Sequence, residues 1–320
     1  MYRKRKVFLS LTGGLGNQLF QYAAVLSRNA NEVVLDSHLG APRKGLGDGP
    51  VLDDFQLHNV NWDDNPITRK KFFAKTSGYL LRSGLKPNSF ERFRPVRKLT
   101  HLLGTVVMSL YFKNKFRLIQ ATDNGFFVMS PSRRNELLVG YFQSHVWTES
   151  SATKVKMKEL RLKSIPEDLA KYIEEYKGLK MLCVHIRRGD YRNESEFGLL
   201  PASYYEHGIA EISTVYEFDK VWLFSDEPDF AMSILPKYLE GKVDVVPDFN
   251  GSASSTLELM RHAGAYVIAN SSLSWWGAWL SYSSNPTIVA PKPWFRSAPE
   301  PQQIIPSNWR RISAWNQEGA

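Results

Sequence analysis

A regular alternation of short apolar segments and amphipathic segments runs through the second half of the chain, and it limits the fold more than any other feature. The apolar segments have the length of buried strands, and the segments between them have the apolar spacing of helices. Strands separated by helices predict a parallel sheet covered by helices on both faces. Strands are expected at about 181–184, 220–224, 243–246, 266–269 and 287–290, and helices at about 166–176, 201–216, 228–235, 255–262 and 273–281.

Polar and charged residues follow the carboxyl end of each expected strand. In an open parallel sheet these ends meet at one edge, and ligands bind there. We therefore expect five loops to form a single crevice. The loops are His185-Ile-Arg-Arg188, Ser225-Asp226-Glu227, Pro247-Asp248, Asn270-Ser271-Ser272 and Pro291-Lys292-Pro293-Trp294.

The first of these loops carries the strongest chemical signal. Two adjacent arginines, Arg187 and Arg188, end an apolar strand, which indicates a binding site for an anion. Because side chains alternate along a strand, His185 and Arg187 are expected on one face and Arg188 on the other. Asp190 is close enough in the chain to pair with one guanidinium group. An ion pair between Arg188 and Asp190 that binds no ligand is the other interpretation of this motif.

The N-terminal part of the chain begins with a strand, a glycine loop and a helix. A strand at about 7–11 is followed by a glycine-rich loop and a helix at about 17–30, and a second strand follows at 31–36. Glycine backbone N–H groups can approach a phosphate at the positive end of such a helix, and Gly14, Gly16 and Asn17 are the candidate residues.

A further strand is expected at 137–143, and a polar helix begins near Thr148. We place a domain boundary there, which gives an N-terminal domain of 1–150 and a C-terminal domain of 151–320.

The glycine loop also resembles a dinucleotide-binding fold, with Asp36 in the position of the acid that binds the ribose. The fingerprint is incomplete, because Leu19 stands where its third glycine is expected. A nicotinamide-dependent oxidoreductase is therefore one alternative for the function. It would leave the segment from His185 to Asp190 without a role.

The net charge of +9 is concentrated in one segment. Thirteen of the 41 basic residues and one of the 32 acidic residues lie between Asn65 and Leu118, together with eight aromatic residues. We interpret this segment as a basic helical insertion. Its composition fits an anionic membrane surface, a nucleic acid, or a solvated helical hairpin with its aromatic residues in the core. A nucleic-acid-binding protein would explain this segment alone, so we expect no nucleic-acid partner.

The cysteine content and the apolar runs bear on the compartment. The single cysteine, Cys183, lies inside an expected strand, which favours a reducing environment. No apolar run approaches the length of a membrane span, and the basic start of the chain is followed only by a short apolar run at 7–11. We expect a cytoplasmic protein of bacterial type, with peripheral contact to the inner face of the membrane through the basic segment.

The segment from Ala269 to Leu280 combines serines with tryptophans. Ser271 or Ser272 is expected to cap a helix, and the tryptophans are expected to pack in the core. A serine hydroxyl at a helix N-terminus on the same edge as Arg187 would add hydrogen-bond donors for a phosphate. Glu258, on the preceding helix, is a candidate contact for a base or ribose, and a solvated helix carboxylate is the other interpretation.

Five motifs in order along the chain resemble the α-1,2-fucosyltransferases, glycosyltransferase family eleven. They are Gly13-Gly-Leu-Gly-Asn-Gln-Leu-Phe-Gln-Tyr-Ala23, Gly140-Tyr-Phe-Gln-Ser144, His185-Ile-Arg-Arg-Gly-Asp-Tyr191, Phe224-Ser-Asp-Glu227 and Ala269-Asn-Ser-Ser-Leu-Ser-Trp-Trp-Gly-Ala-Trp279. The family often has Ser-Asp-Asp where this chain has Ser225-Asp226-Glu227. It also commonly has an Asp before a Leu-Met pair, where this chain has Glu258 before Leu259-Met260. These departures bear on the contacts with guanine.

The resemblance implies an α/β fold of GT-B-like type, with two Rossmann-type domains, a cleft between them and a C-terminal domain that binds the nucleotide sugar. It implies GDP-fucose as the donor, a terminal β-galactoside of an oligosaccharide or lipid-linked glycan as the acceptor, inversion at the anomeric carbon, and no metal or other cofactor. It implies that Arg187 binds the donor diphosphate, that His185 lies against the nucleotide, and that the loop from Gly14 to Asn17 faces the same donor. Another GDP-sugar-dependent glycosyltransferase is the alternative within this class.

Such a transfer needs donors for the leaving diphosphate and a base for the acceptor hydroxyl. For the diphosphate, the candidates are Arg187, the two serines at 271 and 272, and the glycine loop. For the base, Glu194, Glu196 and Asp190 follow the arginine motif closely, and Glu194 is preferred. Asp226, Asn270 and Arg188 complete the expected nucleotide site.

Overall fold

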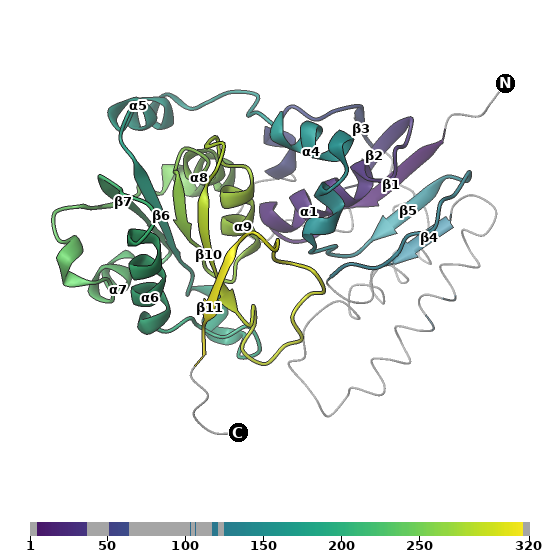
Figure 1. Cartoon of the computed structure of the whole chain (residues 1–320). Coiled ribbons are helices and arrows are strands. Elements are labelled where there is room, and N and C mark those ends of the chain that lie inside the picture. The colour runs from purple at the N-terminus through teal and green to yellow at the C-terminus, as the bar shows by residue number, and fades with distance from the viewer. Residues whose placement is uncertain are drawn as a thin grey trace. The chain divides into compact units, whose positions relative to one another are not determined.

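The computed structural model describes residues 5–36, 51–63, 103, 106, 117–120 and 125–315 (Figure 1). The chain forms two compact units, Met1–Arg161 with Pro301–Ile304 and Leu162–Glu300 with Ile305–Ala320. The helix α4, Ser151–Lys158, which the sequence placed after the domain boundary, is part of the first unit.

The first unit contains a parallel sheet of five strands in the order β3-β2-β1-β5-β4. The expected first two strands are confirmed, and β3 was not among the predicted strands. The strands are β1 (Lys6–Ser10), β2 (Glu32–Asp36), β3 (Val60–Trp62), β4 (Arg117–Gln120) and β5 (Glu136–Val139), and the helices are α1 (Leu15–Leu26), α4 (Ser151–Lys158), η1 (Val51–Asp54) and η4 (His145–Thr148).

Among the boundaries of the first unit that differ from the sequence expectation, two follow from local backbone conformation. The helix α1 begins at Leu15 rather than near Asn17, because Gly14 is extended and its carbonyl accepts the N–H of Asn17 at 3.0 Å. The strand β5 ends at Val139 rather than at 143. Phe142 there has φ 54, a left-handed conformation that a strand does not tolerate.

The second unit contains a parallel sheet of six strands in the order β11-β10-β9-β6-β7-β8. The five expected strands and the five expected helices are confirmed, with ends that differ by one to three residues. The strands are β6 (Met181–Ile186), β7 (Lys220–Ser225), β8 (Val243–Val245), β9 (Ala265–Val267), β10 (Thr287–Lys292) and β11 (Arg310–Ser313). The helices are α5 (Glu167–Glu175), α6 (Ala202–Ser213), α7 (Pro228–Ser233), α8 (Ala253–Met260), α9 (Ser272–Trp279), η5 (Asp190–Asn193), η6 (Lys237–Leu239) and η7 (Phe249–Gly251).

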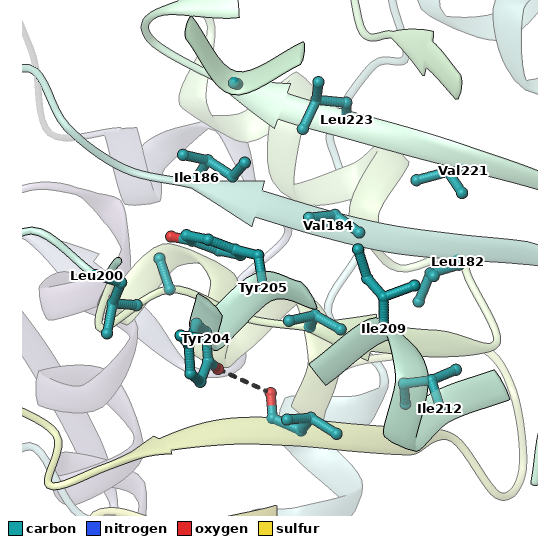
Figure 2. Close-up of a cluster of buried hydrophobic side chains, with 14 of the residues drawn as sticks. Leu182, Val184, Ile186, Leu200, Tyr204, Tyr205, Ile209, Ile212, Val221 and Leu223 are labelled. Atoms are coloured by element: carbon teal, nitrogen blue, oxygen red, sulfur yellow. Dashed lines mark hydrogen bonds between the residues drawn. The ribbon is translucent and has the colours of Figure 1, made fainter. Parts of the chain in front are cut away.

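The central strand β6 is buried along its whole length between β7 and β9. Helix α6 packs against this part of the sheet and contributes Tyr204, Tyr205 and Ile209 to the apolar core (Figure 2). A Cβ on Gly208 would lie 2.8 Å from a methyl group of Val267, so the absence of a side chain lets α6 approach β9 closely. This packing fixes the carboxyl edge of the sheet, where the expected site residues lie.

Helix α9 confirms the packing role of two tryptophans. Trp275 and Trp276 are fully buried, and their ring centroids are 4.8 Å apart in an edge-to-face arrangement. They are therefore part of the core rather than a ligand surface.

The basic insertion expected from Asn65 to Leu118 lies outside the described residues, apart from 103, 106, 117 and 118. In the parts of the chain that the structure describes, no helix combines the length and the apolar character needed to cross a bilayer.

Candidate active site

Four of the five expected loops are connected at the carboxyl edge of the second sheet. The loop after β6 contacts the loop after β9, because the Tyr191 hydroxyl donates to the carbonyl of Asn270 at 3.0 Å. The amide of Asn270 in turn donates to the carbonyl of Phe197 at 3.0 Å. Phe197 stacks on Phe295, in the loop after β10, with ring centroids 4.7 Å apart. The fifth loop, Pro247-Asp248, follows the edge strand β8 and is exposed.

Arg187 connects the loop after β6 to the loop after β7. Its Nη2 lies 2.7 Å from Oδ1 of Asp190, and its Nη1 lies 3.0 Å from Oδ2 of Asp226. Its Nε also donates to Asp190, at 3.1 Å. Two carboxylates therefore fix the direction of the guanidinium, whose side chain remains 32% exposed. The expected pairing of Asp190 with an arginine is confirmed, and the partner is Arg187.

Arg188 has different partners, so the alternative ion pair with Asp190 is wrong. Its Nε donates to Glu227 at 2.9 Å, and its guanidinium lies over the ring of Phe230, 3.5 Å from the centroid. Arg192 also donates to Glu227. The hydrogen bonds from Arg192 and Arg188 hold the pKa of Glu227 below its usual value. Arg188 thus braces the loops, and its side chain is less exposed than that of Arg187.

Gly189 explains how these loops approach each other. A Cβ at this position would lie 2.6 Å from Oδ2 of Asp226, the oxygen that binds Arg187. The backbone N–H of Arg188 also donates to Asp226, at 2.9 Å. The glycine in the motif is therefore required for the pairing of Arg187 with Asp226.

His185 is the last but one residue of β6, and its ring is buried with 6% of the residue exposed. Among the described residues, Nδ1 has no hydrogen-bond partner. Burial, with a smaller effect of the Arg187 charge, lowers the pKa of His185 to about 3. The imidazole is therefore neutral at physiological pH, and its unpartnered nitrogen can hydrogen-bond to a ligand.

This depressed pKa predicts a pH dependence of stability. Between pH 6.5 and about 3 the unfolded chain protonates this histidine and the folded chain does not. The stability that His185 contributes is complete above pH 6.5 and falls by about 1.4 kcal/mol per pH unit below it. Thermal unfolding at pH 7 and pH 5 should therefore show a smaller acid-induced loss in His185→Gln than in the wild type. His207→Gln, which changes an exposed histidine of α6, is the control and should keep the wild-type slope.

The loop after β9 presents unsatisfied polar groups. Ser271 is the N-cap of α9, as expected, but its side chain makes no capping hydrogen bond. Ser272 is the first residue of the helix. Asn270 is 1% exposed, and its Oδ1 has no hydrogen-bond partner among the described residues. These groups, with the N–H groups of the helix end, can bind an anion or a ribose.

Glu258 differs from the expectation of a solvated carboxylate. It is 3% exposed, its Oε2 lies 2.8 Å from Nη1 of Arg261, and its Oε1 accepts the Tyr282 hydroxyl at 2.7 Å. Burial alone would raise the pKa of Glu258, but these partners and His262 hold it below its usual value. Because α8 runs toward the start of β9, this pair lies toward the amino edge, away from Arg187.

Glu194 lies in the loop after η5 and is exposed. Its backbone carbonyl accepts the N–H of Phe197 at 3.0 Å, which orders the loop. Asp190, another of the three candidate bases, is committed to Arg187. Tyr191 and Phe197, which connect the loops, were not predicted as site residues, although Tyr191 closes the arginine motif.

The glycine loop belongs to the first unit. Gly13 has φ +75, and a Cβ on Gly14 would meet no atom within 4 Å. Oδ1 of Asn17 accepts the amide of Gln143 at 2.7 Å, so the first two sequence motifs are joined. Gly16 lies in the first turn of α1, which has no acidic residue. The open backbone at Gly14 and the positive helix end suit an anion.

The described residues contain no group of three or more His, Cys, Asp or Glu side chains arranged to hold a metal ion.

The comparisons with known proteins now identify the class. A family model described as glycosyl transferase family 11 matches residues 102–313, about two thirds of the chain. The chain belongs to glycosyl transferase family 11. Family membership makes it a glycosyltransferase rather than a nicotinamide-dependent oxidoreductase.

Two curated relatives from Escherichia coli resemble this family member along nearly its whole length. An alpha-1,2-colitosyltransferase is 27% identical and covers 96% of this chain and 98% of its own. The O-antigen biosynthesis glycosyltransferase WbnK is 28% identical and covers 90% of this chain and 95% of its own.

Solved structures support the fold. The fucosyltransferase NodZ from Bradyrhizobium is 14% identical with a TM-score of 0.51 and covers 87% of this chain and 94% of its own. NodZ alpha-1,6-fucosyltransferase soaked with GDP-fucose is 16% identical with a TM-score of 0.50 and covers 89% of this chain and 97% of its own. The family 11 chain therefore has the GT-B-like α/β fold, with two parallel sheets.

Proposed function

We propose that this chain is an inverting α-1,2-fucosyltransferase that moves fucose from GDP-fucose to the 2-hydroxyl of a terminal β-galactoside. The observation that carries the proposal is the Arg187 guanidinium, held by Asp190 and Asp226 at the carboxyl edge of a buried parallel sheet. The α-1,2 linkage appears in the name of one relative, and O-antigen biosynthesis appears in that of the other.

The charges around Arg187 indicate how the diphosphate is bound. Three arginines and three carboxylates are ion-paired in this cluster, so it holds no excess positive charge. They are Arg187, Arg188, Arg192, Asp190, Asp226 and Glu227. The two adjacent arginines that indicate an anion site therefore bring no net positive charge to it. Stabilisation of the leaving group comes from directed N–H donors, which need no reorganisation during the reaction.

Arg187 keeps donors for this purpose. A guanidinium has five N–H groups. Nε and Nη2 of Arg187 donate to Asp190, and Nη1 forms an ion pair with Asp226. The five N–H groups outnumber these contacts, so we propose that the terminal nitrogens also donate to the diphosphate. Ser271, Ser272 and the N-terminus of α9 add donors from the next loop.

The acceptor hydroxyl needs a base, and Glu194 is the proposed one. Its exposed carboxylate lies four residues beyond Asp190 on the loop that Arg187 anchors. Asp190 is a weaker candidate, because its oxygen already accepts two hydrogen bonds from Arg187. We keep Asp190 as a residue that orients the arginine.

Replacing Glu194 with glutamine should separate chemistry from donor binding. A general base contributes about 10²-fold or more to turnover, whereas GDP binding does not require it. We expect kcat to fall by about 100-fold, with the dissociation constant of GDP unchanged in calorimetry. Glu206→Gln, which changes an exposed carboxylate of α6, is the matched control. Turnover close to wild type in Glu194→Gln would remove this residue as the base.

Two buried polar groups are available to contact the nucleoside. His185 offers an unpartnered buried nitrogen and Asn270 an unpartnered buried oxygen on the same edge of the sheet. We propose that both contact the nucleoside, and that the Gly14, Gly16 and Asn17 backbone also serves the donor. Glu258 does not fit this role, because Arg261 and Tyr282 occupy both of its oxygens.

Colitose is a second candidate for the transferred sugar, because one relative is an alpha-1,2-colitosyltransferase. Colitose is fucose without the 3-hydroxyl, so the same site could take either donor. A site that hydrogen-bonds this hydroxyl discriminates strongly against the sugar that lacks it. The ratio of kcat/KM for the two GDP-sugars therefore decides the natural donor.

We further propose that the reaction needs no metal ion, because the arginine and the helix end provide donors for the diphosphate. We also propose that the basic segment 65–118 contacts an anionic membrane, where lipid-linked acceptors are found. Flotation with anionic liposomes at low salt tests this contact. Binding that is absent at low salt, or that does not weaken with added salt, would contradict it.

The proposed function is tested by the product itself. The purified protein is incubated with GDP-fucose or GDP-colitose and lactose, and the linkage in the product is read by NMR. The proposal predicts fucose attached through an α-1,2 bond to the galactose. A different linkage, or transfer of colitose alone, would contradict the proposed function and leave the family assignment intact.

A further inference from the structure

We propose that two adjacent buried tyrosines of α6, Tyr204 and Tyr205, are positioning residues that hold the loops after β9 and β6 in the geometry needed to bind the donor. The inference rests on the proposed function for the identity of the donor. It adds two residues that touch neither donor nor acceptor in this account.

The position of the pair follows from the sequence around it. Pro201 precedes α6, and the tyrosines lie in its first turn, next to the edge where β6 and β9 end. Neighbouring residues of a helix point in directions about 100° apart, so the two side chains reach different strands. Each tyrosine is 1% exposed, and their rings are 5.1 Å apart in an edge-to-face arrangement. In Figure 2 the hydroxyl of Tyr205 points toward the end of β6, where Ile186 lies.

Tyr205 provides the acceptor for the first backbone N–H beyond β6. The strand ends at Ile186, so the N–H of Arg187 has no partner in the sheet and must find one elsewhere. The Tyr205 hydroxyl points toward this end of β6 (Figure 2), and it is the acceptor that we assign to this N–H. Burial raises the pKa of Tyr205, and the charges of Arg188 and Asp226 and the backbone of Arg187 also act on it. The hydroxyl therefore fixes the backbone from which the Arg187 guanidinium extends.

Tyr204 does the same for the loop after β9. Its hydroxyl donates to the carbonyl of Ile268 at 2.7 Å, directly after the end of β9 at Val267. The N–H of Ile268 donates to Val289 of β10 at 3.1 Å, so both polar backbone groups of this residue are satisfied. The chain is thus fixed two residues before Asn270.

Both hydroxyls keep their protons across the physiological range. Burial raises the pKa of Tyr204 and of Tyr205, so neither is suited to act as a base in the reaction. Their role is to hold backbone groups, and removal of the hydroxyl alone, by substitution with phenylalanine, is the appropriate test.

Tyr266 provides a matched control. It is fully buried, and its hydroxyl donates to backbone carbonyls of Met260 at 2.9 Å and Ala263 at 2.7 Å, near the start of β9. Tyr266→Phe therefore removes an equally buried hydroxyl at the amino edge of the same sheet, far along the strands from the donor loops.

The first measurement is amide hydrogen exchange of the full chain without ligand. Tyr205→Phe should speed exchange in the peptide around Arg187 by about tenfold, since its N–H loses its acceptor. Tyr204→Phe should likewise speed exchange by about tenfold, in the peptide spanning 268–272. Tyr266→Phe should leave both peptides at the wild-type rate. Unchanged exchange in the tyrosine variants, or equal acceleration in the control, would overturn the proposal that these hydroxyls hold the loops.

The second measurement is the affinity for GDP by calorimetry. We expect the dissociation constant to rise about tenfold in Tyr205→Phe, and to stay at the wild-type value in Tyr266→Phe even if both variants melt at lower temperature. Wild-type affinity in Tyr205→Phe would overturn the link to donor binding. If the wild type binds no GDP, the proposed function fails, and hydrogen exchange alone still decides whether the tyrosines hold the loops.

Discussion

Replacing Arg187 with alanine should lower the kcat of fucose transfer by about 10³-fold. The guanidinium is the directed cation of the site, and the loss of one preorganised donor typically costs about 10²- to 10³-fold in turnover. Here the effect should reach the upper end, because the substitution also leaves Asp190 and Asp226 without their common partner beside the diphosphate. The measurement is steady-state turnover with GDP-fucose and lactose, together with GDP titration.

Two further variants distinguish the origin of this loss. Arg310→Ala removes an arginine that pairs with Glu211 outside the site, and it should keep wild-type turnover. Adding Asp190→Asn to Arg187→Ala removes one unpaired negative charge, so GDP affinity should recover in part while turnover stays low. Turnover of Arg187→Ala within tenfold of the wild type would contradict the assignment of the arginine motif.

Replacing Arg261 with methionine should lower the melting temperature of the second unit by about 10 °C. Arg261 has no exposed surface, and its removal leaves the buried carboxylate of Glu258 without its cation. Breaking a buried ion pair in this way costs about 3–5 kcal/mol, and each kcal/mol shifts the melting temperature of a unit of this size by about 2–4 °C. The measurement is thermal unfolding followed by calorimetry.

The double variant Glu258→Leu with Arg261→Met is the informative control. When both charges are replaced by apolar groups of similar size, the desolvation cost disappears together with the attraction. The melting temperature should therefore recover to near the wild-type value. Lys171→Ala breaks an exposed ion pair with Glu167. It should change the free energy of unfolding by no more than about 1 kcal/mol. A single variant Arg261→Met as stable as the wild type would contradict a structural role for this pair.

The strands of the second unit were predictable where burial imposes a continuous apolar pattern. The segment that forms β6 contains no charged residue before its end, and all six of its residues are buried. In contrast, β11 has the sequence Arg-Arg-Ile-Ser and lies at the edge of the sheet, paired only with β10. Its single apolar residue gives no periodicity, and its pairing is a tertiary contact that sequence spacing does not encode.

The candidate site was predictable in its position but not in its pairings. The rule that ligands bind at the carboxyl edge of a parallel sheet located Arg187, Asp226 and Asn270 correctly at one edge, because it depends only on the order of strands and helices. The partner of Arg188 was not predictable, because Glu227 lies 39 residues further along the chain. Spacing along one strand constrains which side a residue faces, not which residue another loop brings to it.

Glu258 is a second residue whose surroundings could not be predicted from its own segment of sequence. On its own helix it has the features of an exposed carboxylate, with a charged residue three positions later. Its burial depends on Tyr282, which lies 24 residues beyond it and covers the pair. Arg261 was therefore predictable as a partner of Glu258, whereas the burial of the pair was not.

We propose that the chain transfers fucose from GDP-fucose without a metal, and one measurement tests this directly. It is the GDP released from GDP-fucose by the purified protein in the presence of EDTA, with and without lactose. We expect release that depends on lactose and is unaffected by EDTA. No release under any of these conditions, together with no thermal stabilisation by GDP, would contradict it.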